Sequence, residues 1–137
     1  MARSRSGQLL GVAAPGQWAA QLGYSRAIRD GDDVWVSATA PVDAEGQLVG
    51  ADDPYAQARH ILATIGRALD ELGCRLADVR RTRIYLRSFD DLSEVGRAHG
   101  EAFPVCPPAC TVIAVADLVL SGMRVYIEAE ARAGAVQ

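Results

Sequence analysis

The segment Val112–Ala116 reads Val-Ile-Ala-Val-Ala and offers no polar residue to either face of a β-strand. Successive side chains of a strand point to opposite faces, so a strand of this composition needs apolar cover on both sides. The rest of the chain has two segments with the single apolar stripe of an amphipathic helix, and two such helices cover one face of a sheet of about four to six strands. We therefore expect a second copy of the chain to bury the other face, which predicts a homo-oligomer.

The order of apolar patterns along the chain predicts an α+β domain with the element order ββαβαββ. Asp30-Gly31-Asp32-Asp33 lies between two β-rich runs and is typical of a hairpin turn. Asp53 followed by Pro54 is typical of a helix start, and Gly73 stands where the end of that helix is expected. The expected elements are strands at 24–28 and 34–38, a helix over 54–72, a strand at 82–86, a helix over 90–103, and strands at 110–116 and 123–131.

The length of 137 residues is typical of one globular domain. Residues 1–20 contain several glycine and proline breakers and no sustained periodicity. We expect them to form an irregular N-terminal arm that packs on the domain through Leu9, Leu10 and Trp18. Residues 21–137 form the single domain in this interpretation.

The charged residues exclude several classes of function. All 14 basic residues are arginines, so the chain has no lysine for a Schiff base, a pyridoxal phosphate linkage or a P-loop. A formal net charge of −3 argues against nucleic acid as a partner, because phosphate binding relies on clustered cations. No apolar run approaches the roughly 20 residues of a membrane helix, and the N-terminal segment lacks the apolar core of a signal peptide. We expect a cytoplasmic protein with no membrane partner and no cofactor.

The three cysteines, Cys74, Cys106 and Cys110, are odd in number, and nothing else in the chain indicates secretion, so we expect free thiols. Cys106 and Cys110 are spaced as Cys-x3-Cys, which resembles a metal-ligand spacing. With prolines between them and two histidines in the whole chain, too few ligands remain for a zinc site. No metal site is predicted.

Five motifs follow one another in order between about residue 23 and residue 112. They are Gly23-Tyr24-Ser25, Val34-Trp35-Val36-Ser37-Ala38-Thr39, Asp53-Pro54-Tyr55-Ala56-Gln57-Ala58, Asp78-Val79 with Tyr85, and Pro107-Pro108-Ala109-Cys110-Thr111-Val112. Together they resemble the Rid (RidA/YjgF) family of reactive-intermediate imine and enamine deaminases. The resemblance runs from about Tyr24 to Ala131. The resemblance implies a chorismate-mutase-like fold with two helices on one face of the sheet. It also implies a homotrimer with a central β-barrel core and clefts for a small-molecule substrate between its subunits.

The chain departs from the family's pattern at the positions that carry its chemistry. Deaminating members have an arginine that holds the substrate carboxylate, and Cys110 stands at that position. The family's glutamate, which orients the attacking water, falls on Tyr126, with Glu128 two residues further on. The usual asparagine of the second helix is Gly96, and a common strand glycine is Ala38.

The candidate site residues follow from these positions. Cys110 comes after a rigid Pro107-Pro108 corner and acts either as a nucleophile or as part of the pocket wall. Arg26 lies two residues from Tyr24 on the same strand face, which makes it a candidate replacement for the missing arginine. His99 is either a general base or a packed histidine. The predicted catalytic residues are Cys110, Tyr126 and Glu128, and the predicted substrate-binding residues are Tyr24, Arg26, Ser37, Ala109, Thr111 and His99.

The expected function is that of a Rid-type enzyme acting on a reactive imine, enamine or related carbonyl compound in a cleft between subunits. The loss of the arginine predicts poor use of small 2-imino acids and favours substrates without a carboxylate. The alternative is a non-catalytic trimer that binds ligands or acts like a chaperone and has kept the fold without the chemistry. Ribonuclease activity, another activity in this family, fits an acidic chain least.

Overall fold

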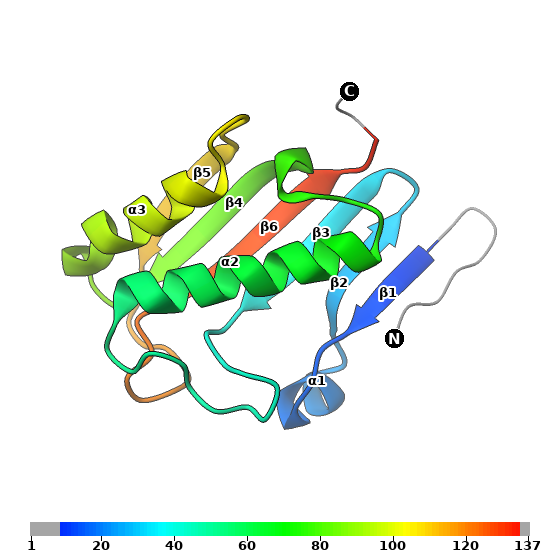
Figure 1. Ribbon diagram of the computed structural model, residues 1–137. Helices are drawn as coiled ribbons and strands as arrows, with labels where there is room; N and C mark the ends of the chain where they lie inside the picture. Colours follow the sequence, from blue (N-terminus) through cyan, green and yellow to red (C-terminus); the bar gives the residue numbers. More distant parts are fainter. Residues whose placement is uncertain (1–8, 135–137) are drawn as a thin grey trace.

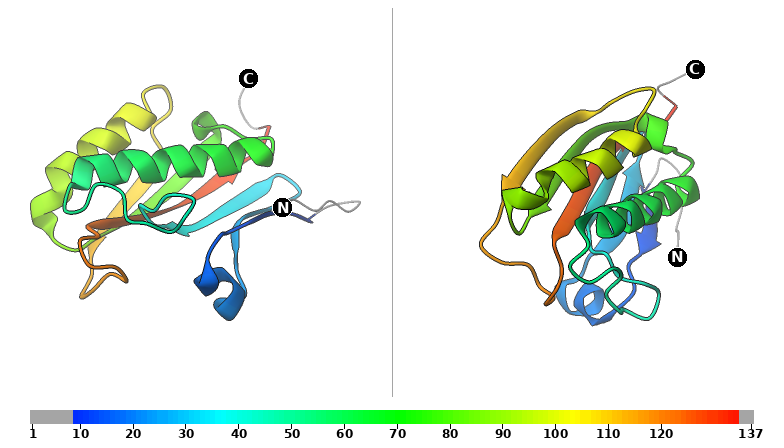
Figure 2. Two further views of the ribbon diagram at one scale, coloured as in Figure 1. Left: turned by 60° about the horizontal axis from the view of Figure 1, so that its bottom comes forward. Right: turned by 60° about the vertical axis from the view of Figure 1, so that its left-hand side comes forward.

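The computed structural model describes residues 9–134, which form a six-stranded sheet with two long helices on one face (Figure 1). The strands follow the order β1-β2-β3-β6-β4-β5 across the sheet. Figure 2 shows α2 and α3 together on one side, while the short helix α1 lies apart from them, next to β1 and β2. The strands are β1 (Leu9–Ala13), β2 (Ser25–Asp30), β3 (Asp33–Thr39), β4 (Val79–Leu86), β5 (Ala109–Ala114) and β6 (Val125–Arg132), and the helices are α1 (Gln17–Leu22), α2 (Pro54–Glu71) and α3 (Leu92–Ala102).

The predicted order of strands and helices is confirmed from β2 to β6. β2 and β3 form the expected antiparallel hairpin, and its turn contains Gly31 at φ 64°, a conformation that glycine adopts without strain. β6 pairs antiparallel with both β3 and β4, which places the last strand of the chain in the middle of the sheet. β4 and β5 are parallel because α3 carries the chain back between them.

α2 begins and ends where the sequence indicates. The carboxylate of Asp53 accepts a hydrogen bond from the backbone N–H of Ala56 at 3.0 Å, as an N-cap residue does. Gly73 follows the helix at φ 78°, and the N–H of Cys74 bonds to the carbonyl of Leu69. One stripe of the helix is completely buried against the sheet: Ala58, Ile61, Ile65 and Leu69.

Asp53→Ala is expected to lower the free energy of unfolding by about 1 kcal/mol, because the N–H of Ala56 loses its partner. Urea denaturation measures this change. Asp53→Asn is the matched control, since an amide oxygen caps a helix about as well as a carboxylate. Equal losses for both variants would contradict a capping role for this side chain.

α3 covers the other half of the same sheet face. Val95 and Phe103 lie in the core as the helical spacing predicts, and Ala98 joins them. The expectation that Leu92 belongs to this stripe is wrong, because Leu92 is the first residue of the helix and remains 43% exposed.

The N-terminal segment is regular where the sequence predicts an irregular arm. Residues 9–13 form an antiparallel edge strand paired with β2, and residues 17–22 form a helix that ends at Gly23 with φ 75°. Leu10 packs against the core as expected, whereas Trp18 is 48% exposed. The glycine and proline breakers that suggest irregular structure lie in the connection between the strand and the helix. Residues 1–8 of the predicted arm lie outside the described residues.

The sheet face away from α2 and α3 carries large apolar side chains that the single chain leaves exposed. Trp35 on β3 is 42% exposed and Ile113 on β5 is 40% exposed. We call this the open face. β5 is also an edge strand, and its residues from Ala109 to Ala114 are half-buried or exposed. Among residues 9–134, no helix has the length and apolar character that crossing a membrane requires.

Candidate functional site

Two neighbouring strands of the sheet are irregular at the same end. The β1–β2 register passes from the pair Val12 and Ala27 to the pair Ala13 and Ser25, which leaves out Arg26. In the β3–β6 pair, Val36 is opposite Ala129 and Thr39 is opposite Ile127. β3 thus advances by three residues where β6 advances by two, so β3 also contains an extra residue. Such bulges redirect side chains and are common beside functional sites.

Hydrogen bonds hold the two irregular segments together. The Ser37 hydroxyl donates to the carbonyl of Ser25 at 2.8 Å, and the Thr39 hydroxyl donates to the carbonyl of Ser37 at 2.8 Å. Arg26 donates from Nη1 to the Oγ1 of the fully buried Thr39 at 3.4 Å. Strand alternation alone predicts Arg26 on the same face as Tyr24, but this rule fails at a bulge. Arg26 instead reaches a threonine of the neighbouring strand.

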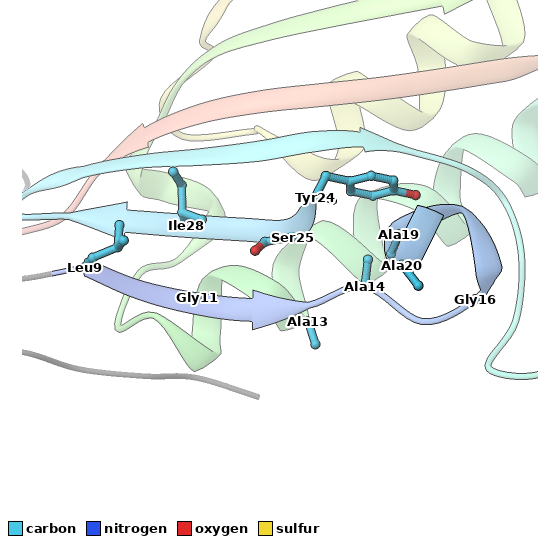
Figure 3. Close-up of a pocket in the computed structure, with 10 residues that line it drawn as sticks. All are labelled: Leu9, Gly11, Ala13, Ala14, Gly16, Ala19, Ala20, Tyr24, Ser25 and Ile28. Carbon is cyan, nitrogen blue, oxygen red and sulfur yellow. The ribbon is translucent and has the colours of Figure 1, made fainter. Parts of the chain in front are cut away.

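Two hollows meet at Tyr24. The first has a volume of about 440 Å³ and lies between β1, α1 and β2. Figure 3 shows its walls, with Gly11 and Ala13 on β1, Ala19 on α1, Tyr24 just before β2 and Ser25 at the start of β2. The second has a volume of about 410 Å³ and lies over the open face. It is lined by Gly23, Tyr24, Ser25, Ala27, Ile28, Trp35, Val36, Ser37, Glu128, Ala129 and Glu130.

Tyr126 points to the open face. It is the direct cross-strand partner of Tyr85, while the neighbouring pair of Ile84 and Ile127 is buried toward the helices. Burial raises the pKa of Tyr126, and the nearby Tyr24 raises it further. Tyr126 is therefore a protonated phenol at neutral pH and can donate a hydrogen bond.

Glu128 lies on the same face with both carboxylate oxygens in hydrogen bonds. Its Oε1 accepts from the Tyr85 hydroxyl at 2.7 Å, and its Oε2 accepts from Arg83 Nη1 at 3.0 Å. Arg83 also donates to Glu130 at 2.8 Å. The hydrogen bond to Glu128 raises the pKa of Tyr85, because it stabilises the protonated phenol. The Glu128 carboxylate is thus held in one orientation.

Cys110 points to the opposite face. Its register partner on β4 is Thr82, which is completely buried on the helix side of the sheet. A hydrogen bond of 2.8 Å joins Thr82 Oγ1 to Nε2 of His99 on α3. The His99 ring also lies 4.7 Å from the ring of Phe103, and burial lowers the pKa of His99, so its imidazole is neutral at pH 7. Cys110 is exposed at this edge of the sheet.

The predicted site residues therefore divide between the two faces of the sheet. Ala109 and Thr111 alternate with Cys110 and share the open face with Arg81, which donates to the Thr111 hydroxyl at 2.9 Å. The open face holds Ser37, Ala109, Thr111, Tyr126 and Glu128, with Tyr24 at its end, whereas Cys110 and His99 lie on the helix side.

Sequence reasoning did not assign Tyr85, Arg83 or Thr82 to the site. Tyr85 and Arg83 fix Glu128, and Thr82 connects His99 to the strand next to Cys110. The alternation of β4 is visible in the sequence, but the register against β5 and β6 is needed to place these side chains. Within the part of the chain that the structure describes, no three His, Cys, Asp or Glu side chains gather as metal ligands would.

Comparisons with known proteins agree with this geometry. Residues 14–133 match the family model described as Endoribonuclease L-PSP. SCO2049 of Streptomyces coelicolor is 35% identical over 125 residues, which are 91% of this chain and 92% of that protein.

Solved structures with this fold include one from a bacterium and one from yeast. Rv2704 of Mycobacterium tuberculosis, a member of the YjgF/YER057c/UK114 family, superposes with a TM-score of 0.82 at 36% identity and covers 91% of this chain and 99% of its own. The yeast protein YEO7 superposes with the same TM-score at 26% identity and covers 92% of this chain and 99% of its own. The chain therefore belongs to the YjgF/UK114 family, whose family model is described as Endoribonuclease L-PSP.

Proposed function

We propose that this protein is a homotrimeric enzyme that acts on small reactive imines, enamines or related carbonyl compounds. Membership of the YjgF/UK114 family supports this proposal. The open face supports it independently, because exposed Trp35 and Ile113 need cover that another copy of the chain would supply.

The observation that carries the proposal is the division of the site residues between two faces of one sheet. Tyr126 and Glu128 point to the open face, while Cys110 lies on the other face beside Thr82, which bonds to His99. One chain cannot bring both groups around one substrate. Two chains can, if the open face of one subunit meets the β5 edge of the next. A cleft between subunits would thus be lined by Tyr24, Ser37 and Tyr126 from one chain and by Cys110 and His99 from another.

The chemistry of this cleft is hydrolysis of a carbon–nitrogen double bond. Water adds to the imine carbon while the nitrogen takes up a proton, and the carbinolamine that results releases ammonia and leaves a carbonyl group. In this proposal Tyr126, whose raised pKa keeps it protonated, donates to the imine nitrogen. Glu128, held by Tyr85 and Arg83, would orient the water from its remaining lone pairs.

The test is imine hydrolysis by the purified trimer. An amino-acid oxidase generates 2-imino acids in situ, an amine oxidase generates imines without a carboxylate, and semicarbazide traps the imine that remains. The proposal predicts that the protein lowers the yield of semicarbazone in at least one series, compared with heat-denatured protein. An unchanged yield in both series, from a folded trimer, would favour the alternative of a trimer that only binds ligands. One observation favours that alternative: Arg83 and Tyr85 already donate hydrogen bonds to the two carboxylate oxygens of Glu128.

Cys110→Ala distinguishes the two roles of this cysteine. We expect less than a tenfold loss of kcat/KM, because the Nε2 atom of His99 is occupied by Thr82 and imine hydrolysis needs no covalent intermediate. Steady-state kinetics on the active imine series measures the change. A loss of about 1000-fold or more would instead assign Cys110 as the nucleophile.

The proposal includes no nucleic acid, membrane or cofactor, and it places the protein in the cytoplasm. Ribonuclease action is disfavoured because Arg83, the arginine next to Glu128, already binds two carboxylates.

A further inference from the structure

The hollow between β1, α1 and β2, which we call the outer hollow, extends the open face to the edge of the sheet (Figure 3). Gly11 on β1 is opposite Ile28 on β2, and Ile28 is opposite Trp35 on β3. Residues directly opposite one another on neighbouring strands share a face, so this row lies on the face that carries Trp35. Because glycine has no side chain, the row ends at β1 in open space, where the outer hollow lies.

The outer hollow adjoins the hollow that carries the proposed site. The two share the lining residues Tyr24, Ser25 and Ile28. Ser37 and Glu128, which belong to the proposed site, line the second hollow. One bound molecule can therefore place its reacting group over the second hollow and another part in the outer one.

The two hollows differ in polarity. Within residues 9–134, no charged side chain lines the outer hollow, whereas Glu128 and Glu130 line the second one. Burying an apolar group is favourable, and burying a charge without a partner is costly. The outer hollow therefore favours an uncharged, apolar group. Apart from the three shared residues, its walls are Leu9, Gly11, Ala13, Ala14, Gly16, Ala19 and Ala20.

Gly11 keeps the outer hollow open without being required by the backbone. Its φ is not in the left-handed region, and a Cβ atom built on it meets only Ser25 Oγ, at an ordinary contact distance of 3.8 Å. Glycine within a strand weakens the strand and often marks a place where a ligand approaches closely. A larger residue at this position would fit the fold of the chain and fill the hollow.

We propose that the outer hollow binds an apolar side chain of the substrate and that Gly11 sets the size of the group it admits. The inference rests on the proposed function, because it names the substrate class of the same site. The substrates are imines or carbonyl compounds with a branched or aromatic apolar substituent. The volume of about 440 Å³ is ample for such a substituent.

The experiment measures binding and does not depend on turnover. Isothermal titration gives the Kd of acetamide and of isovaleramide, two neutral carbonyl compounds that differ by an isopropyl group. Wild type, Gly11→Ile and Ala63→Ile are compared. Isoleucine suits a strand and fills the hollow from β1. Ala63→Ile is the control, because it adds the same side chain at an exposed position of α2, on the other side of the sheet.

Wild type is expected to bind isovaleramide about tenfold or more tightly than acetamide, since each buried CH2 group lowers the Kd about fourfold. Gly11→Ile should raise the Kd of isovaleramide by about tenfold or more and leave that of acetamide within about twofold. Ala63→Ile should change neither value. If Gly11→Ile does not fold, Ala13→Ile fills the same hollow from an exposed position of β1 and should have the same effect.

Equal affinity of wild type for the two amides would overturn the inference, as would failure to bind isovaleramide at millimolar concentrations. A segment of the neighbouring subunit in the outer hollow would give this equal affinity, and Gly11→Ile would then disrupt the trimer in size-exclusion chromatography. An equal loss of both affinities in a folded Gly11→Ile trimer would also contradict it. Failure of the proposed function gives a different pattern. The preference for isovaleramide would then still depend on Gly11, while the imine assay showed no turnover.

Discussion

Tyr126→Phe is expected to lower kcat/KM for imine hydrolysis by about 100-fold or more, because the substitution removes the proton donor and leaves the ring in place. Tyr126 faces the open side of the sheet, opposite Tyr85 and near Tyr24. Steady-state kinetics on the active imine series checks the prediction. Circular dichroism and size-exclusion chromatography confirm that the variant is folded and assembled.

The pH dependence gives a second readout for the same residue. Burial and Tyr24 raise the pKa of Tyr126 above the usual value of 10, so the phenol keeps its proton throughout the neutral range. A role as proton donor needs the protonated form, so this group causes no loss of activity up to about pH 10 and a decline only above that. In Tyr126→Phe the alkaline decline should disappear from the residual activity.

Tyr55→Phe is the matched control, because Tyr55 lies on α2 and its hydroxyl bonds to Glu101, away from the open face. It should leave kcat/KM within about twofold of wild type. A Tyr126→Phe enzyme as active as this control would rule out the assigned role of the phenol.

The second large effect concerns stability. Ile65→Ala is expected to lower the free energy of unfolding by about 2–5 kcal/mol, because it leaves a cavity under α2 where the side chain is completely buried. This is a large part of the roughly 5–15 kcal/mol that stabilises a typical domain. Urea denaturation followed by circular dichroism measures the change.

Arg59→Ala, on the exposed side of the same helix, keeps the helix propensity comparable and should change stability by less than about 0.5 kcal/mol. A similarly small change for Ile65→Ala would mean that α2 does not pack on the sheet through this stripe.

Most of the fold could be predicted from the sequence because its signals are local. The hairpin needs only the turn at Gly31, and α2 needs only its cap at Asp53 and one apolar stripe. β1 could not be predicted in this way. Its pattern is weak, and it forms because β2 offers a free edge for pairing, which depends on the rest of the sheet.

The candidate site was less predictable because it depends on register. Alternation correctly places Tyr126 and Glu128 on one face. It does not show that Cys110 lies on the other face, since that follows from the pairing of Cys110 with Thr82. Arg26 departs from alternation because of a bulge, and no sequence pattern marks that extra residue.

The central claim is that one site is built from two chains, and mixed oligomers test it directly. Tyr126→Phe removes the proton donor of the open face, and Cys110→Trp fills the cleft wall at the β5 edge whichever role the cysteine has. Each variant alone should have no more than a small residual activity. In a trimer that contains both, one site in three pairs a native Tyr126 with a native Cys110 from the next subunit.

Refolding the two variants together at equal concentrations should therefore recover about one quarter of the wild-type activity, given random assembly of a cyclic trimer. If mixed trimers form and are no more active than the two variants alone, the site lies within a single chain and the account is contradicted.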